Sequence, residues 1–174
     1  MRGKLLILGG NMLSVDIVKA AKDMGLYTIV TDWNSTEKSP AKKVADEYWN
    51  TSILDYSELK KRMDEQHIDG IMTGFTDSYL LPYQHLCEIA GKPCYATKEV
   101  LEQTLDKSRF KAMCRRNGVP VVPEYQLREF NPECISHDNK VIIKPVDNSG
   151  SRGIVVCDNP QDFDSCLQLS LIHI

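Results

Sequence analysis

The segment from Val141 to Gly153 joins a short apolar run to a lysine and a loop of small residues. The run is β-branched and bounded by polar residues, which predicts a buried strand. In the loop, small residues let successive backbone N–H groups turn toward one anion, and hydroxyls and an arginine add donors. This chemistry suits a nucleotide polyphosphate, whereas the alternative is a surface hairpin with a solvated loop. The candidate ligands are Lys144, Ser149, Gly150, Ser151, Arg152 and Gly153.

Composition bounds the kind of protein. The chain has 174 residues, of which 42% are hydrophobic and 26% charged, as in a soluble globular protein able to bury a core. Its net charge of −3 gives no general attraction to nucleic acid or to an anionic membrane. The first apolar run is broken by Gly9 and Gly10 and is interpreted as a strand, not a signal or membrane segment. The six cysteines show no zinc spacing, which favours reduced thiols and a cytoplasmic location.

Strands and helices alternate up to about residue 96. Apolar runs predict strands at 5–8, 27–31 and 70–73, and three- and four-residue spacing predicts helices at 14–24, 56–66 and 78–90. Asp55 and Glu58 have the spacing of a helix-capping box, and Gly25 supplies a left-handed helix stop. This order predicts an α/β fold of three layers around a parallel sheet, with a ligand crevice beyond the carboxyl ends of the strands.

The regular alternation of strands and helices ends at about residue 96. The pattern predicts helices at 98–105 and 107–117, an extended stretch at 121–127, and two strands around the loop described above. Asn159 and Pro160 have the types expected at the cap and first position of a further helix. We therefore expect two domains, 1–96 and 97–168, joined without a low-complexity linker.

Two lysines in this second region complete a family pattern. Asp106-Lys107 opens a helix that ends in Gly118-Val119-Pro120, and Lys144-Pro145 follows the later strand. In this order and spacing the chain resembles the ATP-grasp superfamily over essentially all of residues 3 to 168. The resemblance implies a Rossmann-like pre-ATP-grasp domain at 1–96 and an incomplete first α+β ATP-grasp subdomain at 97–168.

The resemblance also implies a reaction. Lys107 and Lys144 would contact the phosphates of ATP, with residues 149–153 as a lid. Enzymes of this kind, which include carboxylate-amine ligases such as carbamoyl phosphate synthase, activate a carboxylate as an acyl phosphate that an amine then attacks. Two Mg²⁺ ions are held in the family by a second lobe, which we expect to lie outside this chain. We therefore assign no metal ligand and no catalytic residue here, and expect the fragment alone to be inactive. The expected partners are small-molecule substrates, with a homo-oligomer as a further possibility.

A second group of candidate site residues lies at the expected crevice. Its candidate residues follow the predicted strands, and an acidic residue after the second strand invites a different interpretation, namely an NAD(P)-binding reductase. The glycine spacing does not fit Gly-x-Gly-x-x-Gly. A third interpretation is a non-catalytic nucleotide-binding module. The family resemblance implies that the crevice binds the carboxylate substrate or supports the clamp, and its residues are Gly10, Asn11, Asp32, Thr76 and Asp77.

The last residues have an unusual sequence. Residues 169–174 read Leu-Ser-Leu-Ile-His-Ile, which is what a transposase-end sequencing adapter encodes. Our hypothesis is that this segment is a non-native tail, and the alternative is a genuine apolar helix or strand end. Longer sequencing reads that contain the same six codons followed by a stop codon would contradict the hypothesis.

Overall fold

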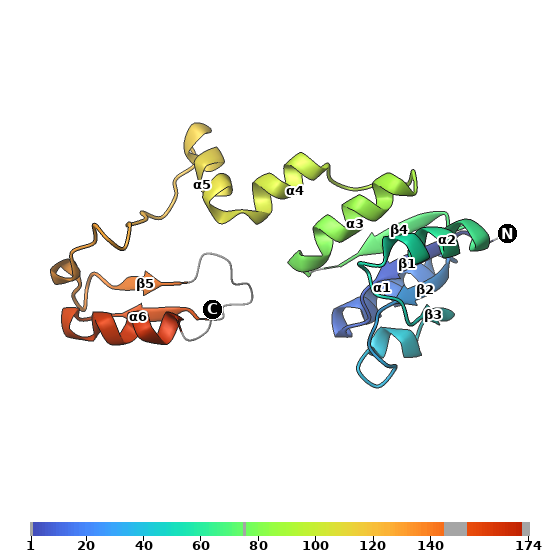
Figure 1. Ribbon diagram of the computed structural model, residues 1–174, viewed down its shortest axis with the longest axis horizontal. Helices are drawn as coiled ribbons and strands as arrows, with labels where there is room; N and C mark the ends of the chain where they lie inside the picture. Colours follow the sequence, from blue (N-terminus) through green and yellow to red (C-terminus); the bar gives the residue numbers. More distant parts are fainter. Residues whose placement is uncertain (1, 75, 145–152, 172–174) are drawn as a thin grey trace. The chain divides into compact units, whose positions relative to one another are not determined.

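The computed structural model of the protein describes residues 2–74, 76–144 and 153–171 (Figure 1). The chain divides into two compact units, Met1–Asp106 and Lys107–Ile174. Helix α4 (Lys98–Leu105) belongs to the first unit because it packs against helix α3 (Asp77–Ile89). The domain boundary expected after residue 96 stays a prediction.

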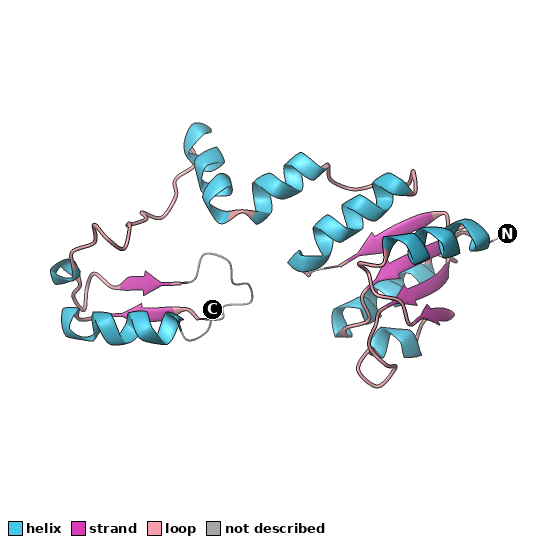
Figure 2. Cartoon of the chain, viewed as in Figure 1, coloured by secondary structure: helices cyan, strands magenta, loops and turns pink. Residues whose placement is uncertain are grey.

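The first unit is built on a parallel four-stranded sheet, drawn in magenta in Figure 2, whose strand order is β3-β2-β1-β4 (labels in Figure 1). In the register of the sheet, Leu8 lies opposite Thr31 on one side and Thr73 on the other. The carboxyl ends of three strands therefore share one edge. The strands are β1 (Lys4–Leu8), β2 (Tyr27–Thr31), β3 (Glu47–Trp49) and β4 (Gly70–Thr73).

Helices cover both faces of this sheet. On one face, Leu6 and Leu8 pack with residues of α2 (Tyr56–Gln66) and α3. On the other, Ile7 packs with Val18 of α1 (Met12–Asp23) and with the 3-10 turn η1 (Pro40–Lys43). Alternate residues of β1 thus enter opposite cores, since successive side chains of a strand point to opposite faces. This confirms the three-layer α/β architecture expected from the sequence.

Local signals account for most of the helix starts. The side chain of Asp55 accepts the backbone N–H of Glu58, as the capping-box spacing predicted. Helix α1 begins two positions earlier than expected because Asn11 caps it, accepting the backbone N–H of Ser14. The short strand β3 was not predicted.

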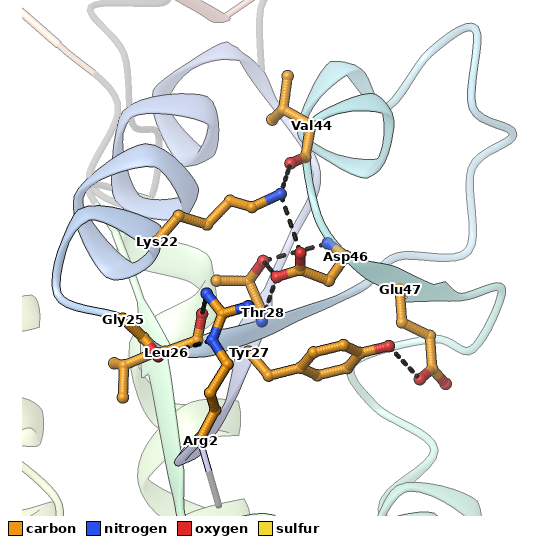
Figure 3. A network of polar contacts seen from close by, with 9 residues as sticks. All are labelled: Arg2, Lys22, Gly25, Leu26, Tyr27, Thr28, Val44, Asp46 and Glu47. Carbon is orange, nitrogen blue, oxygen red and sulfur yellow. Dashed lines mark hydrogen bonds and ion pairs between the residues drawn. The ribbon is translucent and has the colours of Figure 1, made fainter.

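A polar network ties the start of β2 to the segment before β3 (Figure 3). The Asp46 carboxylate accepts the backbone N–H of Thr28 at 2.9 Å and its hydroxyl at 2.8 Å. Lys22 lies 3.1 Å from the other carboxylate oxygen and also donates to the carbonyl of Val44. Burial alone would raise the pKa of Asp46, but the Thr28 hydrogen bonds and Lys22 outweigh it and hold that pKa at about 2.

The second unit contains a two-stranded antiparallel ribbon packed on a helix. One ribbon face carries Val141, Ile143 and Cys157, which pack with Phe163 and Cys166 of the helix. Residues 121–127 were expected to be extended, and they form no strand. The elements are α5 (Lys107–Arg116), η2 (Pro132–Cys134), β5 (Val141–Ile143), β6 (Val155–Cys157), η3 (Pro160–Asp162) and α6 (Phe163–Leu171).

The last helix begins as the sequence predicted. Asn159 caps the turn η3, accepting the backbone N–H of Asp162 at 2.9 Å, and Pro160 takes the first position. Helix α6 then continues through Leu171, so the first residues of the segment 169–174 are helical. Ser170 is buried and donates its hydroxyl to the carbonyl of Gly153 at 2.8 Å. Within the described ranges no helix has the length and hydropathy needed to span a bilayer.

Candidate functional site

The first candidate site lies at the carboxyl edge of the parallel sheet. From β1 the chain continues to β2 on one side, while β4 lies on the other, so the order of strands reverses between β1 and β4. Such a switch point is where open α/β sheets bind ligands. The amide of Asn11, after β1, donates to the hydroxyl of Thr76, after β4, at 3.2 Å. Asp77 follows in the exposed first turn of α3.

The buried carboxylate of Asp32 connects the segments at this edge by hydrogen bonds. It is only 4% exposed, and its Oδ2 accepts the backbone N–H of Gly10 at 2.8 Å. Its Oδ1 accepts the backbone N–H of Asn34 at 2.7 Å and the Asn34 side-chain amide at 2.9 Å. The carboxylate is therefore turned toward the protein, and this geometry disfavours the ribose contact that a dinucleotide site would need.

Lys42 is a buried cation behind the same edge. It is 3% exposed, and its Nζ donates to the carbonyl of Asp32 at 2.6 Å, to the carbonyl of Asn34 at 2.5 Å and to Oδ1 of Asn50 at 2.8 Å. Burial lowers the pKa of Lys42, and the charge of Asp32 opposes that effect. Because its three protons are all engaged, Lys42 fixes the loops after β2 and β3 and is not available to a ligand.

The two glycines after β1 are in close contact with neighbouring side chains. Gly9 has a left-handed φ of +87°, and an added Cβ would lie 2.2 Å from the ring of Tyr79. At Gly10 an added Cβ would lie 2.7 Å from Cβ of the buried Ser39. The sequence analysis did not predict the contact between Tyr79 and Gly9. Burial raises the pKa of Tyr79, and the nearby charge of Asp32 adds to this.

The second candidate site is the β5–β6 ribbon. Lys144 is exposed and directly follows β5, and Gly153, with a left-handed φ of +71°, precedes β6. Ile143, next to Lys144, is the register partner of Val155, which lies two residues after Gly153, so Lys144 and Gly153 lie at the same end of the ribbon. The remaining predicted loop ligands, Ser149, Gly150, Ser151 and Arg152, lie outside the described residues.

The outward face of this ribbon is apolar, which the sequence analysis missed. Ile142 and Val156 are register partners and are 62% and 54% exposed. Lys144, which directly follows the strand, is exposed like Ile142. The sequence signal for this face was the continuous apolar run Val141–Ile143. Its first and third residues pack against α6, and its middle residue, Ile142, is exposed.

Lys107 is the exposed first residue of α5. The side chain of Lys111, one turn later, is 17% exposed and lies 2.5 Å from the Glu124 carboxylate, which Arg115 also contacts at 3.3 Å. These two cations therefore anchor the chain after Pro123, whereas the predicted role of Lys107 concerns a ligand.

Acidic and sulfur ligands do not converge in the described part of the chain. Over residues 2–74, 76–144 and 153–171, no three or more His, Cys, Asp or Glu side chains gather closely enough to hold a metal ion.

Comparison with known proteins gives relatives along nearly the whole chain. No family model matches. Formate-dependent phosphoribosylglycinamide formyltransferase of Bacillus subtilis is 22% identical over 176 residues, covering 97% of this chain and 44% of the relative. The 2-oxoglutarate carboxylase small subunit of Hydrogenobacter thermophilus is 26% identical, covering 92% of this chain and 37% of the relative. The chain thus spans less than half the length of these relatives.

Solved structures show the same fold. An N5-carboxyaminoimidazole ribonucleotide synthetase, crystallised as an ADP complex, matches with a TM-score of 0.75 and 21% identity, over 98% of this chain and 45% of that one. The part of these enzymes that it matches includes the pre-ATP-grasp domain. The homologues of this chain are ATP-grasp enzymes, which confirms the resemblance indicated by its lysine and glycine motifs.

Proposed function

We propose that this chain is the amino-terminal part of an ATP-dependent ligase that activates a carboxylate as an acyl phosphate for attack by an amine. The relatives support this, since the chain resembles them over less than half of their length. In this proposal residues 1–96 contribute the substrate crevice and residues 97–168 the first half of the nucleotide clamp. The substrates are small molecules, in keeping with a cytoplasmic enzyme.

The single observation that carries the proposal is the pairing of Lys144 with an open apolar face. Ile142 and Val156 are exposed register partners, and the exposed Lys144 directly follows β5. Nucleotide sites combine apolar walls with a few placed polar groups, and a base covers such a surface while a cation meets the phosphates. We therefore assign the base to the outward ribbon face and the phosphates to Lys144 and the loop 149–153.

Lys107 and Arg152 complete the phosphate ligands in this proposal. Phosphoryl transfer depends on positioning and on neutralising charge at the phosphate oxygens, so lysine serves as a point-charge partner. Mg²⁺ would add positive charge at the phosphates and would be held by carboxylate ligands. We assign these ligands to the remainder of the longer protein.

The test compares two lysines that flank the same strand. Lys144 follows β5, and Lys140 precedes it, 4.0 Å from Asp158 at an exposed position. In the full-length protein, Lys144→Ala is expected to weaken ATP binding, measured by calorimetry, by a factor on the order of 10 to 100. Lys140→Ala is expected to leave it unchanged. Equal affinities for both variants and the wild type would remove Lys144 from the site.

The same titrations separate the alternatives. Saturable binding of NADH without binding of ATP would replace the ligase by a dinucleotide-dependent reductase. Binding of ATP without release of phosphate, over a panel of carboxylates and amines, would indicate a nucleotide-binding module without catalysis. Phosphate release that requires both a carboxylate and ATP supports the ligase.

A further inference from the structure

Two free cysteines lie close together where helix α3 ends. Cys87 is in the last turn of the helix and is 1% exposed, whereas Cys94, beyond the helix end, is half-buried. Gly91, with a left-handed φ of +62°, reverses the chain, and the N–H of Lys92 donates to the carbonyl of Cys87 at 2.8 Å. This turn leads the chain back, so Cys94 packs against the apolar core that contains Cys87.

The two thiols form one polar cluster with a tyrosine at the edge of this core. Cys87 and Cys94 hydrogen-bond with each other, and the hydroxyl of Tyr83 hydrogen-bonds with both. Tyr83 is 3% exposed, and the ring of Tyr95 stacks on its ring with the centroids 4.8 Å apart. Sulfur atoms in such contact need only a small side-chain adjustment to reach the S–S bond length of about 2 Å.

Burial gives the two thiols different roles. It raises the pKa of Cys87 to about 12, so at neutral pH this thiol stays protonated and does not start a reaction with a solute. Cys94 is partly open to solvent, and thiol–disulfide exchange begins at an accessible sulfur. The Tyr83 hydroxyl, which donates to the Cys87 sulfur, favours the thiolate that a second step needs.

We propose that Cys87 and Cys94 are a reversible redox pair, which a small disulfide such as oxidised glutathione converts to an intramolecular disulfide. The Cys94 thiolate attacks one glutathione sulfur, which forms a mixed disulfide and releases one glutathione thiolate. Cys87 then loses its proton and attacks the Cys94 sulfur, which releases the second glutathione. Two electrons pass from the cysteines to the glutathione disulfide, and the two thiol protons end on two molecules of glutathione.

The new bond would tie the end of α3 to the segment that leads into α4. Excess reduced glutathione reverses both steps, so the pair responds to the redox state of its surroundings. Transient disulfides of this kind are the ones expected in a reducing compartment. The proposal concerns a modification site and does not depend on the ligase function.

A second cysteine pair provides a matched control. Cys157 of β6 and Cys166 of α6 lie together in the core of the second unit, and Sγ of Cys166 is 4.0 Å from the carbonyl oxygen of Val156. The two cysteines are 1% and 8% exposed, so neither thiol is readily reached by a solute. We expect this pair to stay reduced under conditions that oxidise Cys87 and Cys94, because exchange requires access as well as proximity.

Peptide mapping tests the proposal. The full-length protein is treated with oxidised glutathione at neutral pH, unfolded in urea with excess N-ethylmaleimide, and digested with trypsin. Trypsin does not cut between Lys92 and Pro93, so both cysteines of the pair fall in the peptide 63–98. We expect this peptide to carry no maleimide and to be lighter than the unmodified reduced peptide by two hydrogen atoms. Excess reduced glutathione, added before the maleimide, is expected to remove that product.

Single replacements test the order of the two steps. In Cys87→Ser, Cys94 is expected to keep its glutathione, because the neighbouring thiol that displaces it is gone. In Cys94→Ser, Cys87 is expected to react with glutathione disulfide more slowly than Cys94 does in Cys87→Ser, by a factor on the order of 100.

Three results would overturn the proposal, and the wild-type mapping gives each of them even where a variant fails to fold. They are an unmodified Cys94, a glutathione adduct that persists on Cys94, and oxidation of Cys157 and Cys166 at the same rate as the proposed pair.

Discussion

Asp32 and Gly10 are joined by a 2.8 Å hydrogen bond from the glycine N–H to a carboxylate that is almost completely buried. The bond connects the segments that follow two neighbouring parallel strands. It therefore fixes the edge where the candidate substrate crevice lies. An acidic residue that first invited a ribose-binding interpretation serves here as an internal brace.

Replacing Asp32 is expected to destabilise the first unit. Asp32→Ala leaves the Gly10 N–H without its partner in a buried position and removes the carboxylate oxygen that accepts both the backbone and the side-chain N–H of Asn34. Loss of a buried, charged acceptor costs about 2 to 4 kcal/mol. Urea unfolding followed by Trp49 emission measures this, and Asp16→Ala, at an exposed position of α1, is the control. Equal unfolding free energies for the two variants would contradict the brace.

Gly10 and Ser39 are expected to be energetically coupled. In Gly10→Ala the new Cβ would lie 2.7 Å from Cβ of Ser39, so the contact must relax at a cost of about 1 to 3 kcal/mol. Ser39→Gly removes the opposing atoms and should recover part of that loss in the double variant. Gly70→Ala is the matched control, because its Cβ would meet only Leu5 at 3.5 Å. Additive effects of the two changes would show that the contact is not the cause.

The Asp46 network predicts an acid-dependent loss of stability. Its folded pKa of about 2 lies below the ordinary value of 3.8, so ionised Asp46 favours the folded state. The contribution is fully present above about pH 5 and is lost as the pH falls toward 2. Because the side chain is 19% exposed, we expect about 1 to 2 kcal/mol. Urea unfolding at a series of pH values should show a shallower acid dependence for Asp46→Asn than for the wild type. Parallel curves would exclude Asp46 as the source.

Two lysines that each begin a helix test the second phosphate ligand. Lys107 is the first residue of α5, and Lys98, 3.9 Å from Glu102, is the first residue of α4. In the full-length protein, Lys107→Ala is expected to weaken ATP binding by a factor of about 10, while Lys98→Ala leaves it unchanged. Calorimetric titration distinguishes them, and a similar loss in both variants would point to a general effect of charge.

Much of the first unit follows from local patterns. The bounds of β2, β4 and α2 agree with the sequence, because each has a periodic apolar pattern with clear stop signals. Strand β3 was missed since it has only three residues, and the burial of Trp49 depends on packing against α2 and α3. The helix expected at 14–24 begins at Met12 in the structure because Asn11, which was not recognised as a cap, accepts the backbone N–H of Ser14.

For the candidate sites, the sequence predicted which residues lie near one another but not the direction of their side chains. Parallel strands predict that residues after them share an edge, and the Asn11–Thr76 bond shows that two of these residues meet there. The direction in which Asp32 points could not be predicted, because it depends on which N–H groups its loop presents. The roles of Tyr79 and of the open face at Ile142 were missed for a similar reason, since exposure follows from the tertiary neighbours of each side chain.

The contact between Gly9 and Tyr79 has an evolutionary consequence. The ring occupies the space that any side chain at position 9 would need. A larger residue there becomes acceptable only after the ring has been lost or displaced. Among descendants of this sequence, positions 9 and 79 should therefore change together, with glycine kept wherever the aromatic ring is kept.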